Sequence, residues 1–169
     1  MPASAHSIAD REQPLLAVSK RIRALSLGLN IEIELSGRIK SPTSLSAKML
    51  KNGLPSEEIL DIIGIRAVTD TTRDCYRLVR CIHSTFPVIL GEYDDYIAAP
   101  KPNGYRSLHT NVLSPGGLVV EIQVRTHAMH EHSERGFAAH SKYKRHRGVL
   151  STHKTASTAK YLQAGAYYA

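Results

Sequence analysis

The residues best suited to chemistry gather in one short stretch, residues 93–110. This stretch combines acidic, basic, aromatic and histidine side chains with two prolines and a glycine, a mixture that folding alone does not require. Its Lys-Pro-Asn-Gly-Tyr segment, residues 101–105, predicts a rigid loop, because proline fixes φ and the Asn-Gly pair accepts positive φ. A lysine and a tyrosine held close together suit a ligand with one anionic end and one flat end. A nucleotide has both.

A second group of cations surrounds a predicted helix start. Ser41 as N-cap and Pro42 at the first helical position predict a helix that ends near Asn52-Gly53. Arg38 and Lys40 fall in the connection before it, and Lys48 lies on the helix face turned away from Leu45 and Met49. Because free backbone N–H groups at a helix start attract anions, the three cations suggest a phosphate cradle. A solvated basic helix end is the alternative.

Two charged residues occur in an apolar run of strand length, residues 61–68. We interpret this run as a buried central strand, in which Asp61 and Arg66 need partners. Gly64 between them indicates a bulge or a close backbone approach, which would let both side chains point the same way. A purely structural salt bridge remains an alternative.

Two further strands are predicted at residues 107–113 and 119–126, and the Pro-Gly-Gly turn at 115–117 joins them as a hairpin. Along the second strand Glu121, Gln123 and Arg125 face one side, while three apolar residues face the other. A polar strand face is usually solvated. The hairpin nevertheless places Glu121 on the same sheet as the segment after Tyr105.

The remaining pattern predicts an α+β fold. Apolar spacing indicates amphipathic helices at 15–29 and 72–86, a helix at 127–143, and alternation indicates a strand at 31–35. The spacing of Cys75 and Cys81 predicts two buried thiols rather than a disulfide. The histidines at 127, 130 and 132 fall on different helix faces, which argues against a metal site.

A length of 169 residues is most simply one domain. We expect a flexible N-terminus at 1–14, a folded domain at 15–147 and a basic, low-complexity tail at 148–169. The net charge of +7 arises after residue 134, where seven Lys or Arg residues occur without Asp or Glu. Such an end is either solvated or in contact with RNA. The residues do not indicate an oligomeric state and leave homo-oligomerisation open.

Membrane insertion and export are not predicted. The apolar runs are far shorter than the roughly 18–20 residues that span a bilayer. Residues 1–13 lack the apolar core of a signal peptide. A cytoplasmic location is therefore expected.

Several motifs occur in the order and spacing of a known family. They are Gly37-Arg38-x-Lys40, Asp61-x-x-Gly64-x-Arg66, Asp94-Asp95-Tyr96-Ile97, the run from Pro100 to Thr110, the run from Glu121 to Thr126, and Ala138-Ala139-His140. From about residue 31 to 145 the chain resembles the synthetase domain of RelA/SpoT-type alarmone synthetases. The resemblance implies a mixed β-sheet flanked by helices, similar to nucleotidyltransferases. It also implies transfer of the β,γ-diphosphate of ATP to the 3′-hydroxyl of GDP or GTP, with release of AMP.

The resemblance also implies a role for each site residue. Arg38 and Arg66 would hold the adenine of ATP, and Lys40 and Lys48 its phosphates. Asp61 and Glu121 would bind Mg²⁺, and Glu121 would also be the base that takes the proton of the 3′-hydroxyl. Tyr105 would stack on guanine, and the other acceptor-side residues would be Lys101, Asn103, His109, Gln123 and Arg125. The catalytic set is thus Glu121, Asp61 and Lys48.

Departures from the family pattern also carry expectations. The His-Asp motif and helical domain of the bifunctional members' hydrolase do not occur in this sequence, so no ppGpp hydrolysis is expected. The acidic segment 92–95 resembles that of synthesis-only members, whereas Ser141 replaces a usual tryptophan. Two other functions stay open: a toxin-like relative that pyrophosphorylates adenosine nucleotides or tRNA ends, and a nucleotide-binding regulatory module without catalysis.

Overall fold

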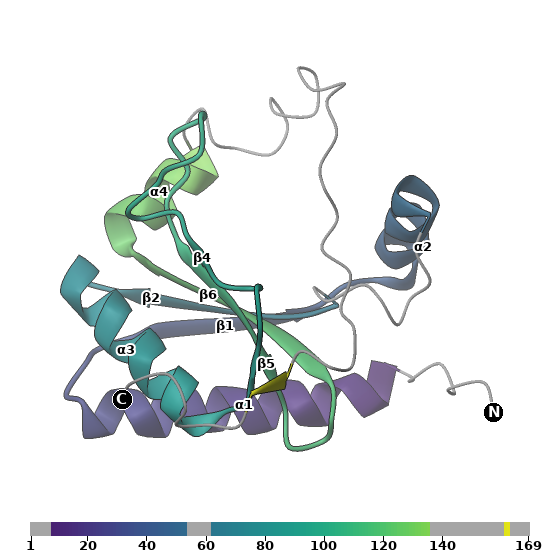
Figure 1. The fold of residues 1–169 in the computed structure, drawn as a ribbon, viewed down its shortest axis with the longest axis horizontal. Helices are drawn as coiled ribbons and strands as arrows, with labels where there is room; N and C mark the ends of the chain where they lie inside the picture. Colours follow the sequence, from purple (N-terminus) through teal and green to yellow (C-terminus); the bar gives the residue numbers. More distant parts are fainter. Residues whose placement is uncertain (1–7, 54–61, 136–160, 163–169) are drawn as a thin grey trace.

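The computed structural model describes residues 8–53, 62–135 and 161–162. Its strands form one mixed sheet in the order β1-β2-β6-β5-β3-β7, with β4 paired to β5 (Figure 1). The strands are β1 (Glu34–Ile39), β2 (Ile63–Thr69), β3 (Val88–Ile89), β4 (Asp94–Asp95), β5 (Leu108–Leu113), β6 (Val119–Thr126) and β7 (Tyr161–Leu162). The central pair, β2 and β6, is parallel, and the other pairings are antiparallel.

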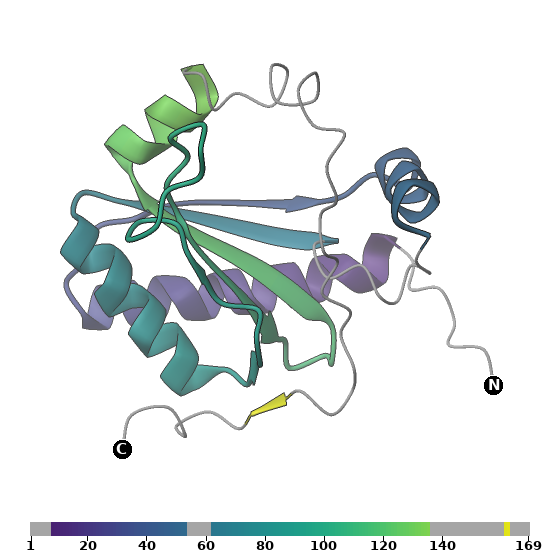
Figure 2. The same cartoon turned by 45° about the horizontal axis from the view of Figure 1, so that its top comes forward.

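Helices lie on both sides of this sheet. They are α1 (Ile8–Gly28), α2 (Pro42–Asn52), α3 (Thr72–Thr85) and α4 (His127–Arg135). α1 and α3 lie along one side, whereas α4 and the loop between β4 and β5 lie on the other (Figures 1 and 2). The predicted α+β fold with a mixed sheet and flanking helices is confirmed.

The apolar core lies between the sheet and the helices α1 and α3. On the strands, residues such as Ile65 and Ile122 point into it and are 1% and 0% exposed. On the helices, Ile22 and Leu78 are fully buried in the same cluster. Because side chains alternate along a strand, burying one face of β2, β6 and β5 leaves every second residue on the opposite face.

Two predicted boundaries are wrong. α1 begins at Ile8 instead of residue 15, so residues 8–14 are helical. The periodic pattern missed this segment because Pro14 interrupts it, and tertiary contacts hold it instead. Pro14 lies near the β5–β6 turn, where its Cγ is 3.6 Å from the position of a Cβ added to Gly116. Leu15 packs so closely on β1 that a Cβ on Gly37 would come within 2.7 Å of its Cδ1.

β1 is also displaced along the chain. It begins at Glu34 and extends to Ile39, whereas alternation predicted a strand at 31–35. Arg38 therefore lies within the strand, opposite Gly64 of β2, and not in the connection to α2. At Gly64 the sequence predicts either a bulge or a close backbone approach. The register of β2 through Gly64 is continuous with both β1 and β6, so the bulge does not occur in these described strands.

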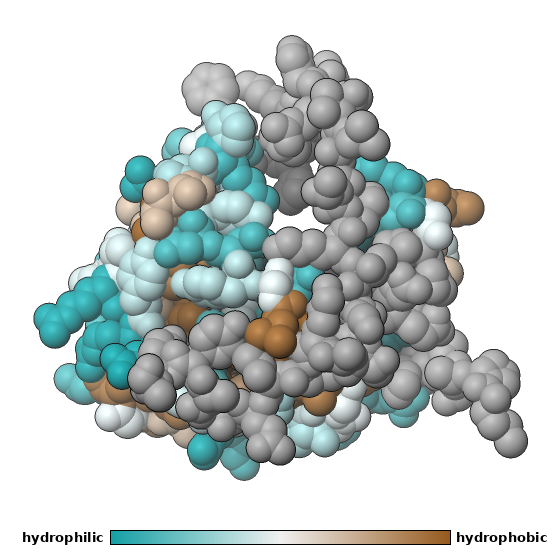
Figure 3. Space-filling model, viewed as in Figure 1, coloured by the Kyte–Doolittle hydropathy of each residue, from teal (hydrophilic) through white to brown (hydrophobic). Residues whose placement is uncertain are grey.

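The predicted capping of α2 is confirmed. The Ser41 side chain accepts a hydrogen bond from the Ser44 N–H, Pro42 follows at the first position, and Gly53 ends the helix with φ 64°. α2 stands at one end of the sheet and exposes apolar surface at its outer edge, brown at the right of Figure 3. Leu50 of α2 is 87% exposed. In the described residues, helices long and apolar enough to cross a membrane do not occur.

The other elements agree with the sequence in type. The predicted hairpin is present as β5 and β6, and α3 matches the predicted helix at 72–86 to within one residue. Both cysteines are free; Cys75 is buried and Cys81 is half-buried. β7, two residues of the predicted low-complexity tail, pairs with β3. Several predicted features lie outside the described residues. They are the rest of that tail, the part of the last helix predicted beyond Arg135, the Ala138-Ala139-His140 motif, and Asp61.

Candidate active site

The polar face of the sheet brings together side chains from strands far apart in sequence. In one cross-strand row, Arg38 lies opposite Gly64, Gly64 beside Glu121, and Glu121 opposite Asn111. In the next row, Arg66 lies beside Gln123, which lies opposite His109. Most of these residues were predicted for the donor or the acceptor nucleotide. The strand register alone therefore collects both groups on one surface.

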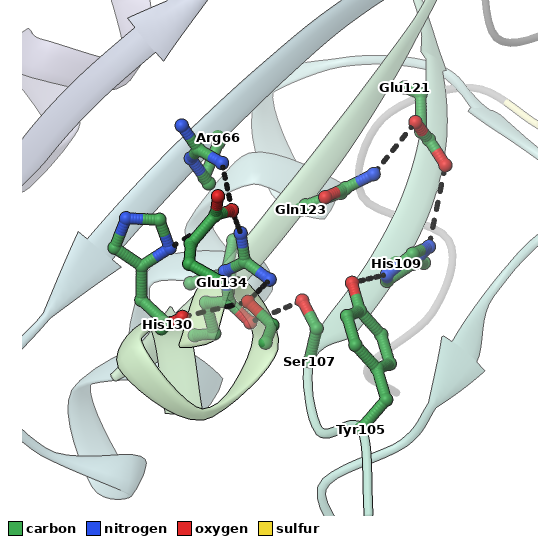
Figure 4. Close-up of polar contacts among 11 residues, drawn as sticks. Arg66, Tyr105, Ser107, His109, Glu121, Gln123, His130 and Glu134 are labelled. Atoms are coloured by element: carbon green, nitrogen blue, oxygen red, sulfur yellow. Dashed lines mark hydrogen bonds and ion pairs between the residues drawn. The ribbon is translucent and has the colours of Figure 1, made fainter. Parts of the chain in front are cut away.

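A carboxylate lies near the centre of this face. Glu121 Oε1 is 3.3 Å from His109 Nδ1, and Gln123 Nε2 donates to Glu121 Oε2 at 3.0 Å (Figure 4). On its other side, His109 Nε2 is 2.8 Å from the Tyr105 hydroxyl. A continuous chain of polar contacts thus joins the aromatic ring of Tyr105 to the carboxylate of Glu121.

Of the two tautomers of a neutral His109, one fits both contacts better. The carboxylate of Glu121 only accepts hydrogen bonds, so a neutral imidazole places its proton on Nδ1. The other nitrogen, Nε2, then accepts from the Tyr105 hydroxyl. The carboxylate keeps further lone pairs, and such an oxygen can accept a proton from a hydroxyl placed against it.

The loop at residues 101–105 has the rigid structure that its sequence predicts. Gly104 N–H donates to the Lys101 carbonyl at 2.8 Å, and Lys101 N–H donates to the Tyr105 carbonyl at 3.1 Å. The positive φ of 78° is at Gly104. Asn103 Oδ1 accepts from the Tyr105 N–H at 3.2 Å, so this predicted ligand residue also supports the loop. The result is a narrow turn that holds Tyr105 at its base.

An aromatic cluster surrounds the turn. The ring of Tyr105 packs edge-on against Tyr96 and His109, with centroids 6.2 and 5.7 Å away. Lys101 Nζ lies 4.2 Å from the centre of the Tyr96 ring and 5.4 Å from that of Tyr105. Burial raises the pKa of Tyr105, and burial together with Asp94 raises the pKa of Tyr96 to about 12. Both phenols are neutral at physiological pH.

Tyr96 was not predicted as a site residue. The sequence motif contains it, but its place against the loop depends on β4. Asp95 accepts hydrogen bonds from the Ile97 and Ala98 N–H groups and from the Tyr76 hydroxyl, at 2.8 to 3.1 Å. One of the two aspartates in the acidic segment is therefore occupied in orienting the chain that carries Tyr96.

Arg125 is a nearly buried cation beside the aromatic cluster. Its side chain is 4% exposed, and burial lowers the pKa of its guanidinium. Its Nη1 donates to Ser133 Oγ at 2.7 Å, its Nη2 is 3.7 Å from Glu134 Oε1, and its Cζ is 5.9 Å from the centre of the Tyr105 ring. The site thus places a positive charge beside the predicted base-stacking ring.

The cations predicted to bind ATP begin beside Glu121 and continue toward α2. A Cβ added to Gly64 would lie 3.7 Å from Arg38 Cγ and 4.0 Å from Glu121 Oε2, so both side chains lie over this glycine. Lys40 follows β1, with its N–H donating to the Ile62 carbonyl at 2.8 Å, and Lys48 lies on α2.

The oxygen donors near Glu121 suit a hard divalent cation. Asn111 is the cross-strand partner of Glu121. Its side-chain oxygen, Oδ1, is buried without a hydrogen-bond partner among the described residues. Carboxylate and amide oxygens are the ligands that Mg²⁺ accepts. The other predicted ligand, Asp61, lies outside the described residues. Within the described part of the chain, groups of three or more His, Cys, Asp or Glu residues that would hold a metal are absent.

Solved structures with a similar fold include small alarmone synthetases. The chain aligns with small alarmone synthetase 2 from Bacillus subtilis with a TM-score of 0.69 and 29% identity, covering 83% of this chain and 81% of that one. Small alarmone synthetase 1 from the same organism, bound to its product pppGpp, aligns with a TM-score of 0.68 and 28% identity, over 79% and 77% of the two chains. The fold is that of the alarmone synthetases.

Sequence comparison gives the family. Residues 37–148 match the region found in RelA / SpoT proteins. The chain is 43% identical over 135 residues to a GTP pyrophosphokinase from Escherichia coli strain K12. The alignment covers 80% of this chain and 18% of that protein. The chain therefore belongs to the RelA/SpoT family. It spans about a fifth of the length of the curated relatives that it matches.

Proposed function

We propose that this chain transfers the β,γ-diphosphate of ATP to the 3′-hydroxyl of GDP or GTP and releases AMP. Its family membership supports the proposal, as do relatives named GTP pyrophosphokinase and a similar structure with bound pppGpp. We place the reaction in the cytoplasm, where both nucleotides are abundant. The predicted RNA contact of the basic tail and the possibility of homo-oligomers stay predictions.

The contact chain from Tyr105 through His109 to Glu121 is the observation that carries this proposal. A guanine stacked on Tyr105 would place its nucleotide along the same sheet face as Glu121. Lys101, Asn103, Gln123 and Arg125 surround that path and would bind the rest of the acceptor. Glu121 would then take the proton of the 3′-hydroxyl as the new bond to phosphorus forms. His109 fixes the orientation of the carboxylate.

The donor side would begin beside the acceptor residues on the same face and continue toward α2. Arg38 and Arg66 would hold the adenine, and Lys40 and Lys48 would contact the phosphates. Phosphoryl transfer depends mainly on alignment of the two reactants and on neutralisation of the phosphate oxygens. Arg38 and Arg66 suit this task, because they lie on strands whose backbone pairing fixes their positions before a substrate binds.

A divalent cation belongs to this proposal. Asp61 and Glu121 would hold Mg²⁺, and Asn111 offers a further oxygen beside Glu121. When bound, the ion would neutralise negative charge on the transferred phosphates.

The test is incubation of the full chain with γ-labelled ATP and one acceptor at a time: GDP, GTP, ADP or tRNA. We expect the label to appear on GDP and GTP, with AMP released in equal amount. Label on tRNA or ADP alone would contradict the proposal and favour a toxin-like activity. Binding of nucleotides without transfer of label would favour a regulatory module.

A further inference from the structure

Glu134 on α4 occupies a position to which the predicted site assigns no role. Its carboxylate atom Oε1 lies 3.2 Å from Arg66 Nη1, 3.7 Å from Arg125 Nη2 and 3.9 Å from His130 Nδ1 (Figure 4). In the sequence, this segment stands out only for its histidines. Helical spacing places positions 130 and 134 on one face, and that face is turned toward the sheet.

The two arginines that meet at Glu134 serve different nucleotides in the proposed reaction. Arg66 on β2 belongs to the ATP side, and Arg125 on β6 lies beside the acceptor ring of Tyr105. Two guanidinium groups this close repel each other, and Arg66 contributes to the lowered pKa of Arg125, after the larger effect of burial. A carboxylate that contacts both offsets this repulsion.

Arg125 in particular depends on α4 for its orientation. Its buried Nε has no hydrogen-bond partner among the described residues, so its remaining N–H groups hold it in place. One of them donates to Ser133 Oγ, which itself donates to the His130 carbonyl at 2.8 Å. The other faces Glu134. Adjacent residues of one helix turn thus restrain the guanidinium that lies next to Tyr105.

We propose that Glu134 is a positioning residue that sets the ATP subsite and the acceptor subsite together, by holding Arg66 and Arg125 with a single carboxylate oxygen. This inference rests on the proposed function, because it takes the two arginines as ligands of two substrates. Since one oxygen is shared, a nucleotide that draws one arginine away leaves the carboxylate to the other. Glu134 would therefore couple the binding of the two nucleotides.

The test compares Glu134→Gln with Glu131→Gln in the full chain. Both residues are exposed on α4 and both changes remove one negative charge, but Glu134 contacts the two arginines, whereas Glu131 forms no ion pair among the described residues. Calorimetry would measure the affinities for GDP and for an ATP analogue with a methylene group between the α- and β-phosphorus atoms. Each ligand would be titrated alone and with the other present.

We expect Glu134→Gln to weaken both affinities by about two- to five-fold, the range of partly exposed ion pairs. It should also remove the effect of each nucleotide on the other, while Glu131→Gln matches the wild type. In an Arg66→Ala background, Glu134→Gln should change the affinity for GDP alone.

Melting temperatures would show that the variants are folded. If Glu134→Gln does not fold, Glu134→Asp takes its place, and a smaller loss for both ligands is expected.

The possible outcomes separate this inference from the proposed function. If the wild type binds both nucleotides and a folded Glu134 variant binds them with the wild-type affinities, the role of Glu134 is overturned and the proposed function is not. A loss confined to one nucleotide overturns it as well. Wild-type protein that binds neither nucleotide overturns the proposed function itself.

Discussion

At Glu121, two neighbours share one carboxylate: His109 contacts one oxygen and Gln123 donates to the other. Replacing this residue by glutamine keeps the size and most hydrogen-bonding capacity but removes the basic oxygen. If Glu121 takes the proton of the acceptor hydroxyl, Glu121→Gln should reduce AMP release at least about 100-fold. Nucleotide affinities should stay within a few-fold of the wild type.

The measurement is AMP formation under single-turnover conditions, with calorimetric titration of GDP alongside. Glu32→Gln, an exposed charge change ahead of β1, is the matched control and should have no effect. Full activity of Glu121→Gln would exclude this carboxylate as the base.

Tyr105 combines a stacking surface with a hydroxyl that contacts His109. Removing the ring in Tyr105→Ala should raise the KM for GDP roughly 5- to 150-fold, if stacking contributes ~1–3 kcal/mol as it does for bases on aromatic side chains. Tyr105→Phe keeps the ring and should leave that KM within a few-fold. Steady-state kinetics with GDP and ATP varied separately test this. An unchanged KM for GDP in Tyr105→Ala would place the guanine elsewhere.

The sequence was more informative about single residues in recognisable motifs than about their partners. Tyr105, His109 and Glu121 were predicted from the family resemblance, and the strand register brings them together. Glu134 and Tyr96 were missed, because their contacts cross between elements and depend on how α4 and β4 lie on the sheet. Such packing has no signature in local residue spacing.

The turn at 101–105 is the element that orients Tyr105, and Gly104 is its critical position. A φ of 78° is costly for residues with a Cβ, by about 1–2 kcal/mol, and a Cβ here would also come within 2.9 Å of His132 Nε2. Gly104→Ala should therefore lower stability by about that amount and raise the KM for GDP.

The matched control is Gly116→Ala in the β5–β6 turn. Gly116 is not among the positive-φ glycines, and an added Cβ would lie 3.6 Å from Pro14 Cγ, an ordinary contact. Urea unfolding should place this variant within about 0.5 kcal/mol of the wild type. Equal stability of both variants would show that the turn tolerates a side chain at Gly104.

At the same scale, element types were easier to predict than element ends. Capping residues determine where α2 begins and ends, so both ends were predicted correctly from Ser41-Pro42 and Asn52-Gly53. β1 was misplaced because its residues after Leu35 do not alternate, and pairing with β2 defines it instead. Local chemistry encodes caps and turns, whereas a partner strand encodes register.

For the molecule as a whole, His83 links stability to pH. Its Nε2 lies 2.9 Å from Thr110 Oγ1, and burial lowers its pKa below the ordinary 6.5. The unfolded chain therefore binds this proton more readily, so stability is fully present above about pH 6.5 and is lost as the pH falls through the folded-state pKa. The urea midpoint of the wild type should therefore decline from pH 7 to 5. The midpoint of His83→Gln should decline less steeply over the same range.

His127→Gln is the matched control, since the His127 side chain is 47% exposed. Its midpoint should follow the wild-type pH dependence. Parallel curves for wild type and His83→Gln would remove His83 as the source of the decline.

The parallel pairing of β2 with β6 has a consequence for synthesis of the chain. β1 and β2 can pair as soon as residue 69 is available, but β6 lies between β2 and β5 and comes last among the site strands. Contacts of this sequence separation close a long loop and slow folding. A nascent chain that ends before residue 126 thus exposes the unpaired edges of β2 and β5, which favour association with other strands. Nucleotides could bind the completed face only after β6 has inserted, so they would select molecules synthesised at least through residue 126.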